Sequence, residues 1–427
     1  MAQISNINLH IKKRPFVQWL ALFIFVMPFL IAFLMDILRA PNLIKYTIDL
    51  AWVLCIALLF MKRHIVFDRK FMPFFIFIGV FFLYTLIGYM FNYQSVFFYL
   101  WGFRNNFRFF SAFIIFCMLF TEDDVEFCMK FLDFMFWVNI AVSLFQFFVL
   151  GLEQDYLGGI FGIERGCNSY SIIFFSIVLS KSILMFMSKQ ETALNCFLKC
   201  GATLVISAMA ELKFFFVIFV IILLLSTIFT SFSWRKFLII LLSAILFTFA
   251  SSILTELFGE SSNVSFERIM ELTFSTNYSS QEDLSRFTAI PTLSESVMHS
   301  DLERIFGMGL GNCDTSTFAI CNTPFYQTYS YLHYSWFSSA FLFLETGFVG
   351  LTMYLIFFVM CLVFSLNQRR QKDANKLYCQ MAVIMSIICL ALTFYNGSLR
   401  FEVAYMVYFV LALPFIDSRS KISRLNP

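Results

Sequence analysis

The chain has 427 residues, of which 60% are hydrophobic and 13% are charged, and its mean hydropathy is +0.80. A water-soluble domain of this length needs far more polar surface, so the composition excludes a soluble globular protein. The formal net charge is only +3, which gives no basis for nucleic-acid binding.

Apolar stretches bounded by charges or turn residues predict about twelve membrane-crossing helices, because roughly 20 residues span the hydrocarbon and its backbone must be helical. In chain order the predicted spans are 16–38, 43–61, 71–91, 104–120, 127–150, 169–187, 194–210, 213–232, 237–254, 344–366, 377–395 and 401–416. The first follows a polar, basic start and is long enough to span, so we expect a membrane helix rather than a cleaved signal peptide.

The predicted fold is therefore an all-α polytopic membrane protein with one large extracytoplasmic loop before its last three spans. Residues 1–254 contain the first nine helices, residues 255–343 form the loop, and residues 344–427 contain the last three helices and a tail. The loop is rich in Ser, Thr, Asn and Glu, and we expect surface helices in it.

Lysine and arginine gather in alternate short connections, which predicts that these connections and both chain ends are cytoplasmic. The residues are Lys12, Lys13, Arg14, Lys62, Arg63, Arg69, Lys70, Lys189, Lys199, Arg235, Lys236, Arg369, Arg370, Lys372, Lys376, Arg419, Lys421 and Arg424.

The eleven cysteines lie mostly inside apolar runs, and their spacing with histidine predicts no metal site. Cys313 and Cys321 are the exception, because both lie in the loop and could form a disulfide in an oxidising compartment. The sequence leaves that pairing open. The run from Gly307 to Gly311 predicts turns; a dinucleotide site is rejected because no βαβ unit surrounds it.

Charges at the outer ends of the spans are costly near lipid, so they are candidates for function. They are Arg104, Arg108, Arg165, Glu211, Lys213, Arg286, Arg304, Glu345, Arg400 and Glu402. Cations outnumber carboxylates there, against the expected charge bias, and would suit an anionic lipid diphosphate that arginine grips with paired hydrogen bonds.

Simpler interpretations of these charges stay open. Arg104 and Arg108 share a helix face and could extend to lipid headgroups, and Glu211 with Lys213 could be a local ion pair. Arg400 and Glu402 could neutralise each other.

Two further candidates also have simpler interpretations. Arg286 could belong to the solvated face of an amphipathic stretch, 286–299. His333 could be a packed interfacial residue.

Four short motifs together resemble the bacterial O-antigen ligase and polymerase superfamily. They are Ser285-Arg286-Phe287, Phe306-Gly307-Met308-Gly309-Leu310-Gly311, Leu332-His333-Tyr334 and Glu345-Thr346-Gly347-Phe348-Val349-Gly350. The architecture, with a large external loop before the last three spans, is similar too. Two positions depart from the family pattern. Tyr334 stands where Asn often follows the His, and Glu211-Leu212-Lys213 stands where Ser-Arg or Ser-Lys is common before the eighth span.

The resemblance implies a metal-independent glycosyltransferase without a cofactor, in a bacterial inner membrane with the loop on the periplasmic side. Its donor would be an undecaprenyl-diphosphate-linked oligosaccharide. Arg286 would stabilise the leaving diphosphate, helped by Lys213, Arg165, Arg108 and Arg104. His333, a residue type that titrates near neutral pH, would position or deprotonate the acceptor.

Glu345 would orient His333 or cap the span that follows. Besides the lipid-linked sugars and membrane lipids, the partners implied are a chain-length regulator and a flippase.

A repeat-unit polymerase is favoured over a ligase that transfers the polymer to lipid A–core. The resemblance covers both activities, so the acceptor, the sugar and the oligomeric state stay open. A transporter or flippase for lipid-linked sugars is the main non-enzymatic alternative. It is disfavoured because no repeat relates the two halves and the loop is one-sided.

Overall fold

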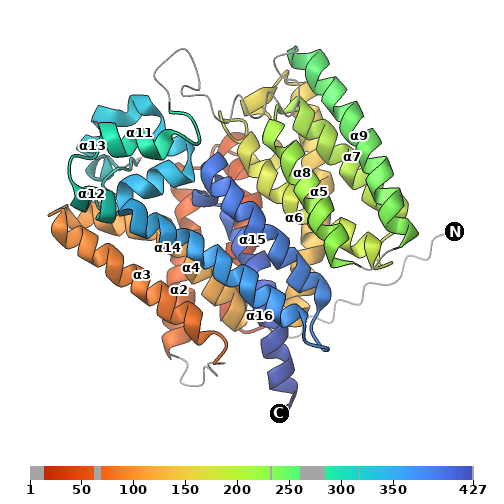
Figure 1. Cartoon of the computed structure of the whole chain (residues 1–427), viewed down its shortest axis with the longest axis horizontal. Helices are drawn as coiled ribbons and strands as arrows, with labels where there is room; N and C mark the ends of the chain where they lie inside the picture. Colours follow the sequence, from red (N-terminus) through yellow and green to blue (C-terminus); the bar gives the residue numbers. More distant parts are fainter. Residues whose placement is uncertain (1–13, 62–68, 231–232, 260–283, 317, 426–427) are drawn as a thin grey trace.

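The computed structural model describes residues 14–61, 69–230, 233–259, 284–316 and 318–425, and every element in them is a helix. The long helices form one bundle, and three short helices cover part of one end of it (Figure 1). The short helices are α11 (Ala289–Ser296), α12 (Asp301–Phe306) and α13 (Pro324–Tyr329). We call this the loop end of the bundle.

The long helices alternate in direction between the loop end and the opposite end (Figure 1). They are α1 (Phe16–Val26), α2 (Thr47–Met61), α3 (Met72–Phe91), α4 (Val96–Leu119), α5 (Glu122–Phe148), α6 (Asn168–Met187), α7 (Ala193–Met209), α8 (Lys213–Phe229), α9 (Trp234–Phe258), α14 (Ser338–Arg369), α15 (Lys376–Tyr395) and α16 (Ala404–Leu425).

Seven segments are long and apolar enough to cross a membrane, which confirms a helical membrane protein at the level of length and composition. They are Asn42–Met61, Met72–Phe91, Glu122–Phe148, Asn168–Met187, Trp234–Phe258, Ser338–Arg369 and Lys376–Tyr395. Three shorter apolar helices, Phe16–Phe29, Ala193–Met209 and Lys213–Phe229, accompany them.

The centre of the bundle is formed by α6, α15 and α16. In the apolar stretch of α6, 89% of the residues are buried, whereas the figure is 22% for α9 at the edge of the bundle. A helix buried all round needs apolar side chains on every face, and α6 has them. The edge helices instead leave large apolar side chains exposed, as a lipid-facing surface would.

Several predicted boundaries are wrong, and local backbone chemistry explains them. The span predicted at 16–38 breaks after Val26, because Pro28 has no N–H to continue the helix; a 3-10 turn and a π-helical segment follow. The helix predicted from 104 begins at Val96, where Ser95 accepts a hydrogen bond from Phe97 N.

The loop predicted at 255–343 is shorter on both sides. Helix α9 continues to Phe258 and α14 begins at Ser338, whose N–H and hydroxyl donate to Asn396 O at 3.1 and 2.9 Å. The amphipathic stretch predicted at 286–299 forms the helix α11, which covers only Ala289–Ser296.

At the opposite end, arginines donate to the carbonyls that close helices. Arg419 donates to Cys117 O at 2.6 Å near the end of α4, and Arg235 donates to Phe186 O at 2.8 Å near the end of α6. Arg369 donates to Phe229 O of α8, also at 2.8 Å. Cations at helix C-termini satisfy unpaired carbonyls and complement the helix dipole. Of the predicted cytoplasmic cations, Lys12, Lys13, Lys62, Arg63 and the Arg424 side chain lie outside the described residues.

Helix α4 packs closely against the glycine turn at residues 307–311, and substitutions can test this contact. A Cβ at Gly102 would collide with the backbone of Gly311, whereas a Cβ at Gly79 on α3 meets nothing within 4 Å. We expect Gly102→Ala to lower the unfolding free energy by roughly 2 kcal/mol or more, as overpacking does. Gly79→Ala should leave it unchanged or slightly raise it. Thermal unfolding of the purified protein measures both, and equal melting temperatures would contradict the packing.

Candidate functional site

The glycine turn predicted at residues 307–311 is present and packs against a kink in α14. Gly307, Gly309 and Gly311 all have positive φ, which favours glycine. Met308 N donates to Leu344 O at 2.7 Å, and Gly309 N donates to Glu345 O at 3.1 Å. These bonds fix the turn to the first helical turns of α14.

The side chain of Glu345 supports this turn. Its Oε1 accepts a hydrogen bond from Gly311 N at 2.9 Å, and its side chain is buried. Helix α14 begins at Ser338, but its backbone is not helical at Gly347, so the capping of the span that follows Glu345 stays a prediction, as does the orientation of His333. The kink at Gly347, where φ is +66°, lets the chain of α12 approach α14 closely. The carboxylate of Glu345 therefore faces the glycine turn.

Tyr334 connects the glycine turn to the segment that carries His333. Its ring is buried, and its hydroxyl donates to Cys313 O at 2.6 Å. This residue is the predicted departure from the family pattern, and it anchors the turn that follows His333. Cys313 and Cys321 are both buried free thiols, so they form no disulfide in this structure. Burial raises the pKa of both thiols, which disfavours the reactive thiolate.

His333 lies between two single 3-10 turns, η8 (Ser330–Leu332) and η9 (Tyr334–Trp336). Its backbone is left-handed, with φ +52°; its N–H donates to Ser330 O, and its carbonyl accepts from Trp336 N. A non-glycine residue with positive φ is uncommon and stores strain that tends to occur at functional sites. The imidazole stacks on the Trp336 ring, with 4.1 Å between centroids and 23° between planes.

Arg286 lies against the end of α15. Its guanidinium is 4.2 Å from the centroid of the Tyr395 ring, and its Nε donates to Tyr395 O at 3.3 Å. Phe214 stacks on the same ring with 3.9 Å between centroids. Two groups this close cannot share one face of a ring, so Tyr395 lies between Arg286 and Phe214.

Lys213 comes directly before Phe214 and begins α8. Its ammonium pairs with Glu211 at 3.1 Å, which confirms the predicted local ion pair. Both side chains are about one quarter exposed, so the pair lies at the rim of the bundle. Tyr395 therefore connects the segment of Lys213 with Arg286.

A backbone hydrogen bond brings Arg286 and His333 into one region. Leu284 N donates to Leu332 O at 3.5 Å. Arg286 follows Leu284 by two residues, and His333 follows Leu332 directly. The chain segments of the two predicted catalytic residues are thus neighbours at the loop end, although the residues are 47 positions apart in sequence.

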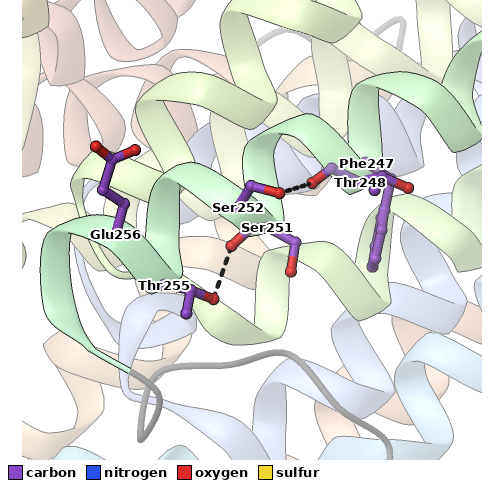
Figure 2. A pocket seen from close by; sticks show the side chains of 6 residues that line it. All are labelled: Phe247, Thr248, Ser251, Ser252, Thr255 and Glu256. Carbon is purple, nitrogen blue, oxygen red and sulfur yellow. Dashed lines mark hydrogen bonds between the residues drawn. The ribbon is translucent and has the colours of Figure 1, made fainter.

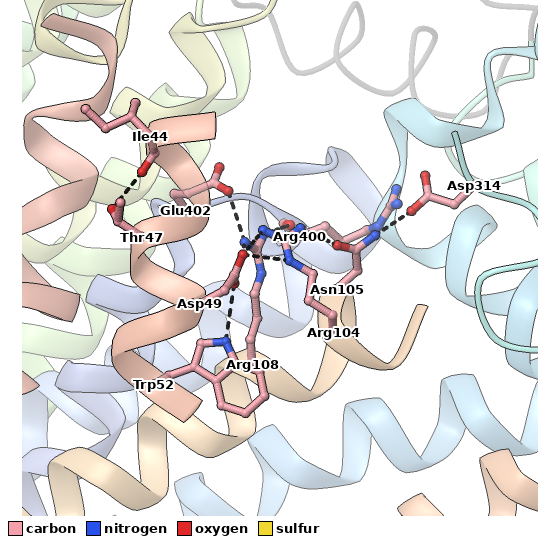
Figure 3. Close-up of polar contacts among 10 residues, drawn as sticks. All are labelled: Ile44, Thr47, Asp49, Trp52, Arg104, Asn105, Arg108, Asp314, Arg400 and Glu402. Atoms are coloured by element: carbon pink, nitrogen blue, oxygen red, sulfur yellow. Dashed lines mark hydrogen bonds and ion pairs between the residues drawn. The ribbon is translucent and has the colours of Figure 1, made fainter. Parts of the chain in front are cut away.

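Arg104 and Arg108 lie in a charged network with carboxylates from two other segments (Figure 3). Arg104 pairs with Asp49 of α2 at 2.6 Å, and Arg108 pairs with Glu402 at 3.0 Å. The Arg108 side chain is only 3% exposed. Buried charges need partners of this kind, so the charges of both arginines are compensated within the protein. Extension of both side chains to lipid headgroups, the simpler interpretation, is wrong.

The predicted neutralisation of Glu402 by Arg400 is wrong as well. Glu402 pairs with Arg108, which also donates to Arg400 O at 3.1 Å. The guanidinium of Arg400 turns the other way, donating to Ser335 O at 3.4 Å and lying 3.0 Å from the centroid of the Phe341 ring. Among the described residues no carboxylate lies within 4 Å of it. Burial lowers the pKa of Arg400, and the charges of Asp314 and Glu345 raise it.

Arg400 is one of the outer charges that the sequence singles out, but it has no role in the predicted site. It is half-buried beneath the turn that carries His333, because Ser335 accepts its hydrogen bond. No sequence signal places it there, because Ser335 and Arg400 are 65 positions apart. Arg165 is placed differently: it is 71% exposed, and its Nε is 3.8 Å from Asp155 in the connection between α5 and α6.

A hollow of about 530 Å³ lies along α9, away from these residues (Figure 2). Phe247, Thr248, Ser251, Ser252, Thr255 and Glu256 line it. Ser252 and Thr255 donate to carbonyls of their own helix, as Figure 2 shows. A ligand site needs polar groups converging from several elements, so this hollow is not the candidate site.

The Arg108–Glu402 pair gives a stability prediction. Arg108→Met should lower the unfolding free energy by about 3 kcal/mol, because it leaves a carboxylate enclosed without its partner. Adding Glu402→Gln should recover part of that loss. As a control, Lys130→Ala removes the exposed pair with Glu126, which contributes only about 0.5 kcal/mol. Chemical unfolding measures these changes, and a double variant no more stable than Arg108→Met would contradict the pairing.

Comparison with known proteins adds no assignment to this geometry. No protein-family model matches the sequence, and no curated protein matches it.

Proposed function

We propose that the protein is a polysaccharide repeat-unit polymerase of the membrane. In the proposed reaction it transfers a glycan from undecaprenyl diphosphate to a sugar hydroxyl of a second carrier-linked repeat unit. The observation that supports this most is the meeting of the Arg286 and His333 segments at the loop end, through the hydrogen bond between Leu284 and Leu332. A cation and a base in one place are what such a transfer requires.

The reaction forms a bond between the acceptor oxygen and the anomeric carbon and breaks the bond between that carbon and the diphosphate oxygen. Negative charge develops on the departing diphosphate, and the acceptor hydroxyl loses its proton. Fixed cations stabilise the first charge, and an imidazole takes the proton. In this proposal His333 is the base.

Arg286 is proposed to contact the diphosphate. The ring of Tyr395 and the hydrogen bond to Tyr395 O hold the guanidinium in place, so less conformational entropy is lost when it binds an anion. Lys213 lies next to Phe214, which stacks on the other face of Tyr395, and its pair with Glu211 would have to open before its ammonium binds a diphosphate. Arg400 adds a third cation, and it has no carboxylate within 4 Å among the described residues.

The roles of the remaining predicted cations follow from their partners. The charges of Arg104 and Arg108 are compensated by Asp49 and Glu402, so we propose that these residues position the segment around Arg400. Arg165, exposed at the rim, would attract an anionic substrate through long-range electrostatics.

The proposed orientation places the loop end outside the cytoplasm, in a bacterial inner membrane. The opposite end carries the arginines that close α4, α6 and α8, and basic residues are enriched on the cytoplasmic side. Undecaprenyl-linked sugars are then met at the outer leaflet. A chain-length regulator and a flippase are the proposed protein partners.

Substitutions at the two central residues test the mechanism. Arg286→Ala and His333→Ala should abolish long-chain polysaccharide while the protein stays in the membrane. Arg286→Lys should cause a substantial loss as well, because lysine lacks the paired hydrogen-bond geometry. Arg304→Ala is the matched control, since Arg304 is a loop-end arginine whose partner, Asp301, is exposed. Gel electrophoresis of surface glycan measures chain length, and normal chains in either Ala variant would remove that residue from the mechanism.

Deletion of the gene separates the polymerase from the ligase alternative. A polymerase mutant should carry single repeat units on lipid A–core. A ligase mutant would instead show bare core and accumulate carrier-linked polymer. If carrier-linked repeat units stayed on the inner leaflet, the activity would be transport rather than transfer. The same gel, combined with extraction of carrier lipids, distinguishes the three outcomes.

A further inference from the structure

Two exposed aromatic side chains flank His333 in sequence, Tyr331 on η8 and Trp336 on η9. Tyr331 is 55% exposed and Trp336 is 37% exposed. Large rings left in solvent cost free energy unless something covers them. Both rings are close to His333 in sequence, and Trp336 stacks on its imidazole, so these two rings are candidates for binding a ligand.

Other rings of the same segment pack inward. Phe325 contacts Tyr334 with 5.7 Å between centroids, and Tyr334 contacts Phe341 with 6.2 Å. Within the described part of the chain, Trp336 stacks on His333 alone, and Tyr331 makes no ring contact. One face of the Trp336 ring is therefore covered by the imidazole, and 37% of the residue stays exposed.

The chemistry of the surroundings points to a sugar. A pyranose ring has faces of C–H groups that pack on aromatic rings, and hydroxyls around its edge that need hydrogen-bonding partners. Tyrosine and tryptophan supply both a flat apolar surface and a polar donor. Phosphate and other small anions would be recognised by cations instead, and Arg286 and Arg400 lie nearby for that purpose.

We infer that Trp336 and Tyr331 form a carbohydrate-binding platform that holds the acceptor sugar beside His333. The inference rests on the proposed function, because it identifies the acceptor side of the same site. A sugar against the open part of the Trp336 ring lies next to the imidazole that the ring stacks on. The platform would thus orient a hydroxyl toward the base, and the stacking would hold the imidazole in place.

Binding of a free glycan tests the platform without any transfer reaction. The probe is the oligosaccharide released by mild acid from the surface polysaccharide of the producing strain. Saturation-transfer NMR with the full-length protein in nanodiscs measures affinity. Trp336→Ala should weaken binding about tenfold, and Tyr331→Ala should weaken it as well. Trp336→Phe should weaken binding less than threefold, because phenylalanine keeps a flat face.

The matched control is Trp234→Ala at the start of α9. Trp234 is also exposed, at 73%, and stacks on one neighbour, Phe237, with 5.0 Å between centroids. Its removal should leave glycan affinity unchanged. Wild-type affinity in both Trp336→Ala and Tyr331→Ala would overturn the platform. If Trp336→Ala fails to fold, Tyr331→Ala and Trp336→Phe decide the question.

Fluorescence quenching distinguishes a sugar platform from an aromatic anchor in lipid. The emission of Trp336, taken as the difference between wild type and Trp336→Phe, should be quenched by acrylamide in water and protected by the oligosaccharide. Quenching by spin-labelled lipid instead would overturn the inference. The probe has no diphosphate, so loss of the polymerase mechanism in Arg286→Ala cells and loss of glycan binding are separate results.

Discussion

A guanidinium enclosed by helices must have its charge compensated, and the loop end of the bundle is organised by this constraint. Arg108 lies inside the bundle on α4 and pairs with Glu402, which comes from a segment 294 residues away. Arg104, one turn earlier, pairs with Asp49 of α2. Leaving one of these charges enclosed without its partner would cost about 3 kcal/mol or more, so each arginine requires its carboxylate in the folded bundle.

This network fixes the position of the segment between α15 and α16, on which the proposed site depends. Arg108 donates to Arg400 O, and Arg400 in turn donates to Ser335 O in the turn after His333. At the other end of the same segment, the ring of Tyr395 contacts the guanidinium of Arg286. The cation and the base of the proposed reaction are therefore both supported by residues 395–402.

The two ends of the bundle use cations differently. At the opposite end, Arg419, Arg235 and Arg369 donate to carbonyls that close helices, so their charge complements helix dipoles. At the loop end, Arg104 and Arg108 are compensated by carboxylates, and the ring of Phe341 covers Arg400. At the loop end, Arg400 is therefore a cation that a bound anion could contact without breaking an ion pair among the described residues.

Hydropathy predicted the helical membrane fold, because apolar runs of about 20 residues have few other structures available to them. The Glu211–Lys213 pair was also predictable, since both residues lie in one turn. The partner of Glu402 was not, because Arg108 is distant in sequence. The hydrogen bond of Glu345 to Gly311 depends on the kink at Gly347, which no periodicity reveals. Helix caps and Pro28 place helix ends at residues other than the predicted ones, because hydropathy does not locate helix ends closely.

The most direct test of the central claim is reconstitution of the purified protein with carrier-linked repeat units as the only substrate. We expect a ladder of longer lipid-linked glycans and the release of one undecaprenyl diphosphate for each new linkage. Movement of the substrate across the bilayer with no new linkage and no free carrier would contradict it.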